Sequence, residues 1–225
     1  NIFVFCLTWS IGASLLGENR AKFDLYMKKL CMEAVPDGLI YDHVFSPETK
    51  RWEKWTDRVP AYEGPSPFAA YEIIVPTKDS VLYMHLLEQQ APRKPILFVG
   101  ESGTSKTVCV SAYLAQLDSE TNSTLTMGFS SRTTSMDVQV NIEANVDKRA
   151  GNVYGPPVGK KLVIFIDDMN MPKVDTYGTQ QPITLLLTLM SRGFIYDRVK
   201  DLNQKLLKDL QQIGAMGPPG GGRNP

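Results

Sequence analysis

A glycine-rich segment that ends in a lysine and a threonine is the part of the sequence best suited to phosphate chemistry. It reads Gly-Glu-Ser-Gly-Thr-Ser-Lys-Thr and follows the apolar run Pro95–Val99. A loop of this kind between a strand and a helix directs unpaired backbone N–H groups at a phosphate. Lys106 would neutralise phosphate oxygens, and the Thr107 hydroxyl would bind Mg²⁺. The predicted nucleotide contacts are Gly100, Glu101, Ser102, Gly103, Thr104, Ser105, Lys106, Thr107 and Val108.

Ser105 departs from the strict form of this motif, GxxxxGK[ST], in which a glycine precedes the lysine. The departure puts the backbone freedom of the loop in doubt, because glycine adopts left-handed conformations more readily than serine. The relaxed pattern also arises by chance in chains of this length, so the loop needs support from a second motif.

Two adjacent aspartates supply that support. The apolar run Leu162–Ile166 leads directly into Asp167 and Asp168, as in sites where a buried strand ends in an acid that holds Mg²⁺. We expect Asp167 to bind the metal, directly or through water, and Asp168 to orient or deprotonate the attacking water. The alternative is an acidic turn without a metal. ATPases of this kind usually carry glutamate at the second position, and the shorter aspartate would hold the water less well. Together the motifs predict nucleotide binding and leave efficient hydrolysis open.

The elements around both motifs alternate between strand and helix, which indicates a parallel α/β sheet. The run before the loop is short, wholly apolar and bounded by Pro and Gly, as expected of a central parallel strand. We therefore predict a three-layer P-loop domain, an α/β fold with a parallel sheet flanked by helices. The predicted strands are 95–99, 125–129, 162–166 and 213–216, and the predicted helices are 77–90, 108–117, 135–149 and 183–190.

Residues 1–67 are interpreted as a lead-in helix and hairpin that join residues 68–225, the P-loop domain, to a preceding module. The uncharged residues 1–17 are too short for the roughly 20 apolar residues of a membrane span and lack the basic stretch of a signal peptide. We interpret them as a helix buried in a larger protein. The next features are an amphipathic helix over 20–34 with Phe23, Met27, Leu30 and Ala34 inward, a β-hairpin over 39–55 with Trp52 and Trp55 as packing residues, and a connector over 60–67.

The composition excludes some partners and leaves others. Lys and Arg number 24 and so do Asp and Glu, so no net charge favours nucleic acid or an anionic membrane, and we expect neither as a partner. Three cysteines without CxxC spacing argue against a disulfide framework or a zinc site and suit a reducing, cytoplasmic compartment. The 225 residues, which begin without Met and end in a glycine-rich run, suggest part of a longer chain.

Seven short motifs resemble the third AAA+ module of axonemal dynein heavy chains. The resemblance covers residues 68–225 motif by motif. The motifs are Gly-Glu-Ser-Gly-Thr-Ser-Lys-Thr (100–107), Phe-Ser-Ser-Arg-Thr-Thr-Ser (129–135), Val-Asp-Lys-Arg (146–149), Tyr-Gly-Pro-Pro (154–157), Ile-Asp-Asp-Met-Asn-Met-Pro (166–172), Tyr-Gly-Thr-Gln-Gln-Pro (177–182) and Met-Gly-Pro-Pro-Gly-Gly-Gly-Arg-Asn-Pro (216–225).

The resemblance implies one sector of a six-module ATPase ring that drives ciliary and flagellar beating along microtubules. The implied ligands are ATP or ADP with Mg²⁺, and the implied location is the axoneme, within the cytoskeleton. Implied partners are the neighbouring AAA+ modules and, through the parent motor, dynein intermediate and light chains and microtubules. Ile74 and Val75 would lie beside the adenine, with a core strand as the alternative. Arg223 and Arg198 are candidates for an arginine that acts on a neighbour's site, with a solvated surface role as the alternative.

Two departures from the family pattern bear on turnover. Met216 and Gly217 stand at the end of the fourth predicted strand, where AAA+ proteins usually carry a polar sensor, and the helical lid is expected after Pro225, so the domain is truncated before it. We therefore expect an ATP-binding module that serves as a regulatory site, with little or no ATPase activity in the isolated chain. The alternative is a non-hydrolysing structural ring module with a vestigial P-loop.

Overall fold

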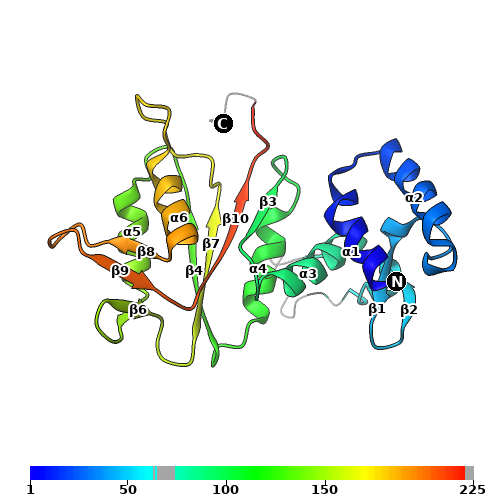
Figure 1. The fold of residues 1–225 in the computed structure, drawn as a ribbon, viewed down its shortest axis with the longest axis horizontal. Coiled ribbons are helices and arrows are strands. Elements are labelled where there is room, and N and C mark those ends of the chain that lie inside the picture. Colours follow the sequence, from blue (N-terminus) through cyan, green and yellow to red (C-terminus); the bar gives the residue numbers. More distant parts are fainter. Residues whose placement is uncertain (63, 65–73, 221–225) are drawn as a thin grey trace. The chain divides into compact units, whose positions relative to one another are not determined.

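The computed structural model describes residues 1–62, 64 and 74–220 (Figure 1). The chain divides into two units, Asn1–Tyr83 and Met84–Pro225. The boundary predicted after residue 67 and half of the predicted connector lie outside the described residues.

The described residues of the first unit include two complete helices and an antiparallel hairpin. The helices are α1 (Ile2–Ser10) and α2 (Glu18–Cys31), and the strands are β1 (His43–Ser46) and β2 (Arg51–Lys54). The hairpin is thus confirmed, and Trp52 and Trp55 pack as predicted, since Trp55 is fully buried and the Trp52 indole N–H donates to Ala34 O at 3.1 Å. Short 3₁₀ turns η1 (Gly12–Ser14), η2 (Met32–Ala34), η3 (Ile40–Asp42) and η4 (Trp55–Arg58) connect these elements.

The inward face of α2 differs from the predicted one. Met27 is 1% exposed, as expected, but Leu30 is 60% exposed and the charged Asp24 is only 4% exposed. Asp24 is tolerated inside because its carboxylate accepts hydrogen bonds from Ile40 N at 2.8 Å and Lys28 Nζ at 2.7 Å. Hydrophobic periodicity predicts an inward Leu30 from apolar spacing alone. It also assigns every carboxylate to solvent, so it cannot predict that Asp24 is buried.

The second unit is built on a parallel sheet with the strand order β3-β10-β7-β4, which confirms the predicted α/β class. Helix α3 begins in the first unit and ends in the second. The strands are β3 (Ile96–Val99), β4 (Asn122–Gly128), β7 (Lys161–Asp167) and β10 (Leu210–Met216), and the helices are α3 (Lys78–Gln90), α4 (Lys106–Gln116), α5 (Ser135–Glu143) and α6 (Gln181–Arg192).

Helices cover both faces of this sheet because its central strand is apolar on both sides (Figure 1). Leu162, Ile164 and Ile166 of β7 pack against α5 and α6, whereas Val163 and Phe165 pack with α4 and the end of α3. Alternate residues of a strand face opposite sides, so one run of five apolar residues builds both cores.

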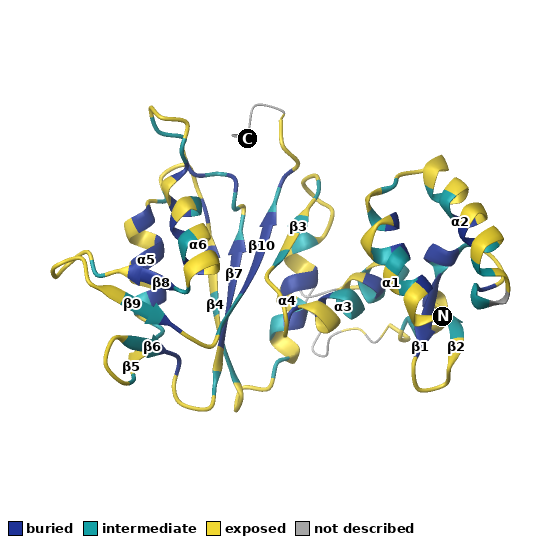
Figure 2. Ribbon diagram, in the orientation of Figure 1, coloured by how far each residue is buried: buried dark blue, intermediate teal, exposed yellow. Residues whose placement is uncertain are grey.

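Strand β3 is not the central strand predicted from its sequence. Within the described residues it pairs with β10 alone and forms one edge of the sheet, and Leu97 and Val99 are about half exposed. Figure 2 shows the contrast with the buried β7 and β10. The prediction was wrong because an apolar run shows that a strand can be buried on both faces, not how many neighbours it has.

A second small sheet was not predicted. Its order is β5-β6-β9-β8, formed by β5 (Asp147–Lys148), β6 (Val153–Gly155), β9 (Gln204–Leu207) and β8 (Phe194–Tyr196). The helix predicted to run to residue 149 ends at Glu143, because residues 147 and 148 join this sheet. Strands of two to four residues are too short to produce a periodic signal.

Candidate functional site

The predicted phosphate loop and the predicted acids lie at the same edge of the main sheet. Residues 100–105 follow β3, Asp167 is the last residue of β7, and Met216 is the last residue of β10, which lies between them (Figure 1). The strands are parallel, so their carboxyl ends meet at one edge, where open α/β sheets bind ligands.

The loop is closed by hydrogen bonds from its own residues. Gly100 N donates to Met216 O at 3.2 Å, which joins the start of the loop to the end of β10. Lys106 Nζ donates to the carbonyl oxygens of Gly100 and Glu101, both at 2.7 Å, and Thr104 Oγ1 donates to Glu101 O at 2.8 Å. The ammonium group of Lys106 is therefore held at the centre of the loop.

The backbone of the loop requires residues that tolerate special conformations. Gly103 has a φ of +82°, and a Cβ on Gly100 would lie only 3.0 Å from Thr104 Oγ1. Ser105 occupies the left-handed region at φ 61° and ψ 20°. Serine can therefore adopt the conformation that the strict motif assigns to glycine, at a cost of about 1 kcal/mol. The departure at Ser105 does not prevent the loop from forming.

The N-terminus of α4 is open to a ligand. Residues 101–105 are exposed, and so are Thr107 and Val108 in the first turn. Cys109 follows them but is buried, and burial raises the pKa of its thiol, so this cysteine is a packing residue without thiolate reactivity.

A hydroxyl and a carboxylate meet between the two motifs. Thr107 Oγ1 donates to Asp167 Oδ2 at 2.7 Å, and Asp168 N donates to Asp167 Oδ1 at 2.9 Å. Both oxygens of the Asp167 carboxylate are therefore fixed. Asp168 is exposed and has a φ of +51°, a conformation that aspartate tolerates better than most residues.

This donor set fits Mg²⁺ bound together with a phosphate. Mg²⁺ prefers hard oxygen ligands and is usually held by one or two carboxylates, water and substrate phosphates. No group of three His, Cys, Asp or Glu residues with metal-ligand geometry occurs among the residues that the structure describes. Thr107 and Asp167 are thus suited to a metal that brings most of its ligands with it.

Several predicted site residues are not placed beside the loop by the structure. Ile74 and Val75 are exposed and outside any strand, which does not fit the alternative of a core strand, and they belong to the first unit. Arg223 lies outside the described residues. Arg198 belongs to the second unit, in the loop after β8, where its Nη1 donates to Ser135 Oγ at 2.9 Å.

Two polar residues that follow Asp168 in the chain, Asn170 and Gln180, were not identified as site residues from the sequence. Gln180 Nε2 donates to the carbonyl oxygens of Asn170 and Pro172, at 3.1 and 2.7 Å, and so holds the segment after Asp168 in place. Asn170 is 2% exposed, and its amide atoms have no hydrogen-bond partner among the described residues. The sequence signal that could have identified Asn170 is its position within the motif Ile-Asp-Asp-Met-Asn-Met-Pro (166–172).

Comparison with known proteins decides the family. Residues 62–225 match the family model of the P-loop containing dynein motor region. The chain belongs to this family. Residues 1–57 match a second model, that of the dynein heavy chain AAA lid domain. A P-loop of the dynein motor region implies nucleotide binding, and the geometry above is that of such a loop.

Relatives of this dynein-family chain include axonemal and flagellar dynein heavy chains. The flagellar inner arm I1 complex dynein-1-alpha heavy chain of Chlamydomonas reinhardtii is 46% identical over the whole chain. Human dynein axonemal heavy chain 10 is 46% identical over 99% of the chain, and human dynein axonemal heavy chain 12 is 39% identical over 99%. The chain spans only 5 to 8% of the length of these relatives. No helix in the described part of the chain is long and apolar enough to span a membrane.

Proposed function

We propose that this chain is a nucleotide-binding AAA+ module of an axonemal dynein heavy chain, and that its site binds ATP or ADP with Mg²⁺. The 2.7 Å hydrogen bond between Thr107 and Asp167 carries the proposal, because it joins the phosphate loop to the acid of the second motif. A loop that had lost its function would have no need to keep these two oxygen ligands for a metal ion together.

The residues have distinct roles in this proposal. Backbone amides of residues 100–105 and the start of α4 bind the phosphates, and Lys106 places its charge among them. Thr107 and Asp167 hold Mg²⁺, which supplies charge neutralisation when bound. Asp168 orients the attacking water and accepts its proton. Arg223 and Arg198 are the candidates for an arginine that completes a neighbour's site.

The role we propose within the motor is regulatory. Strand β10 ends beside the loop at Met216, which is apolar. AAA+ proteins usually carry a polar side chain at this position, where it senses the terminal phosphate. Turnover at such a site is slow, so the bound nucleotide persists and sets the shape of the module. The parent motor would move along microtubules in the axoneme, with the neighbouring AAA+ modules and the intermediate and light chains as partners.

We further propose that residues 1–57 are the lid of the preceding module. The match of these residues to the dynein AAA lid supports this assignment, because the lid of an AAA+ module follows its own P-loop domain in the chain. Residues 62–225 would then begin the next module.

Titration with a fluorescent ATP analogue and Mg²⁺ tests nucleotide binding. We expect Lys106→Ala to weaken binding at least tenfold and Lys94→Ala, a control at an exposed lysine before β3, to leave it unchanged. Equal affinity of wild type and Lys106→Ala would favour the structural ring module with a vestigial loop. Phosphate release from the assembled motor tests hydrolysis, and an unchanged rate in Asp168→Asn would remove Asp168 from the chemistry.

A further inference from the structure

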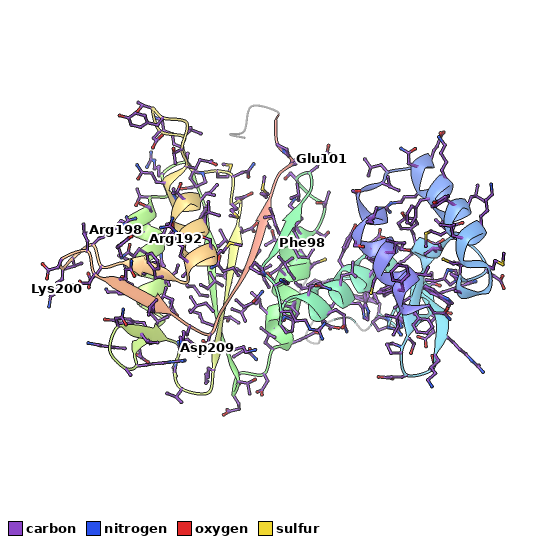
Figure 3. The ribbon with its side chains drawn as sticks, in the orientation of Figure 1. Phe98, Glu101, Arg192, Arg198, Lys200 and Asp209 are labelled. Carbon is purple, nitrogen blue, oxygen red and sulfur yellow. The ribbon has the colours of Figure 1, made fainter. Side chains whose placement is uncertain are left out.

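A pocket apart from the phosphate loop contains a single charged residue, Arg198. The pocket has a volume of 240 Å³. Leu185 of α6 and Ile195 of β8 are buried and line its interior, Thr184 and Thr188 of α6 form a wall, and Tyr196 and Arg198 are among the other lining residues. The pocket lies on the α5–α6 side of the main sheet, and Figure 3 shows Arg198 well away from Glu101 of the loop.

The charge of Arg198 is not balanced within the described residues. No carboxylate among them lies within 4.0 Å of its guanidinium, although Asp197 is the preceding residue. The Asp197 carboxylate is engaged elsewhere, since it accepts hydrogen bonds from Lys205 Nζ at 3.1 Å and from the backbone N of Val199 at 3.0 Å. Ser135 Oγ accepts one of the five N–H groups that a guanidinium offers.

A second cation, Lys200, and an apolar side chain, Val199, follow Arg198 in the sequence and extend the surface beside the pocket. Lys200 is exposed and forms no ion pair within the described ranges, and Val199 is 80% exposed between the two basic residues. Figure 3 shows Arg198 and Lys200 on the same outer side of the second unit. An acidic partner would therefore gain both charge neutralisation and apolar contact.

The size and lining of the pocket restrict its ligand. A volume of 240 Å³ is below the roughly 300–1,000 Å³ of small-molecule sites, so the pocket suits one amino-acid side chain better than a nucleotide. A triphosphate would meet one guanidinium and several apolar groups, whereas a carboxylate pairs with a single guanidinium through two hydrogen bonds.

We propose that this pocket, which we call the Arg198 pocket, docks a polypeptide segment from another part of the motor. The segment presents an apolar side chain to Leu185 and Ile195 and an adjacent Asp or Glu to Arg198. The proposal does not depend on nucleotide binding at the phosphate loop, and it gives Arg198 a role other than the completion of a neighbour's site.

Fluorescence anisotropy with short labelled peptides tests the proposal. The probes are peptides in which Leu, Ile, Phe or Met stands next to Glu or Asp, and matched peptides carry Gln or Asn in place of the acids. We expect acidic peptides to bind the full chain and the amide peptides to bind at least fivefold more weakly. Arg198→Gln should remove this preference, and Arg93→Gln, at an exposed arginine after α3, should retain it.

A second variant separates docking from a loss of folding. Thr188→Trp fills the pocket and leaves Arg198 in place, so it should abolish binding while circular dichroism shows an intact fold. Lys106→Ala should bind the peptides like wild type, so failure here is distinguishable from failure of the nucleotide proposal. The proposal is overturned by no binding up to about 1 mM peptide, by equal binding of acidic and amide peptides, or by full competition from inorganic phosphate.

Discussion

Thr107 and Asp167 are 60 residues apart in the sequence, yet Thr107 Oγ1 donates to Asp167 Oδ2 at 2.7 Å. The contact exists because β3, which leads into the loop before Thr107, and β7, which ends at Asp167, both flank β10 and end at the same edge. The second Asp167 oxygen accepts from Asp168 N, so the carboxylate has a fixed orientation toward the loop. An oriented hydroxyl–carboxylate pair beside a helix N-terminus is prepared for a metal ion that accompanies a phosphate.

Asp167→Asn should make nucleotide binding independent of Mg²⁺. The amide keeps the size of the side chain but removes the negative charge that a hard cation requires. We expect affinity for Mg-ADP, measured by isothermal titration calorimetry, to fall at least tenfold, while affinity for ADP in EDTA stays close to that of wild type.

Asp201→Asn is the matched control for this prediction. Asp201 also has a positive φ, 49°, but lies in the loop between β8 and β9, and asparagine tolerates that conformation. If Asp167→Asn lost the same affinity with and without Mg²⁺, Asp167 would support the loop and not the metal.

Ser105→Gly should stabilise the phosphate loop and α4. Ser105 has a φ of 61°, and its replacement by glycine removes the steric cost of a Cβ in the left-handed region. We expect a gain of about 0.5–1 kcal/mol, since glycine also adds entropy to the unfolded chain. Hydrogen exchange of α4 amides is the suitable readout, because all three tryptophans, at positions 9, 52 and 55, belong to the first unit.

Gly103→Ala provides the opposite change in the same loop. Gly103 has a φ of +82° with free space where the Cβ would lie, so alanine meets only the conformational penalty. It should destabilise the α4 amides by about 1 kcal/mol. Slower exchange in Gly103→Ala, or faster exchange in Ser105→Gly, would contradict the strain assigned to Ser105.

Short-range sequence patterns predicted the main sheet, and they also located the candidate loop and the candidate acid, which the structure brings to one edge of that sheet. Residues 100–107 are consecutive in the sequence and form one loop with the start of α4. Leu162–Asp167 is a buried strand with an acid at its end. The position of β3 at the sheet edge depends on pairing between segments more than 100 residues apart, which no local pattern reports. Asp24 was missed for a related reason, since its partner Ile40 N belongs to a different element.

Met27→Ala and Leu30→Ala test the corrected face of α2. Met27 is 1% exposed and Leu30 is 60% exposed, although the apolar spacing gives them equivalent positions. We expect Met27→Ala to lower the free energy of unfolding of the first unit by about 2–5 kcal/mol. Leu30→Ala should change it by about 0.5 kcal/mol or less. Urea unfolding followed by tryptophan fluorescence reports on this unit, and similar losses in both variants would show that Leu30 is inward.

The loop beside the Arg198 pocket should lose stability in acid. Hydrogen bonds from Lys205 and from the backbone N of Val199 and Lys200 lower the pKa of Asp197, although burial opposes them. Burial alone would lower the pKa of Lys205, but its hydrogen bonds to Asp197 and Glu143 raise it. The pKa of folded Asp197 is depressed, so its stabilisation is present above the ordinary value of 3.8 and is lost as pH falls through the folded pKa.

NMR titration of the Asp197 carboxyl carbon checks this pH dependence. Wild-type Asp197 should titrate below 3.8, and Lys205→Met should move the titration upward because the strongest of its hydrogen bonds is gone. Lys208→Met removes an exposed lysine just after β9 and should leave the Asp197 titration unchanged. If Asp197 titrated at its ordinary value in wild type, its carboxylate would not be committed to Lys205 and the loop amides. It would then be available to neutralise Arg198, and an acidic docking segment would have no unbalanced charge to meet.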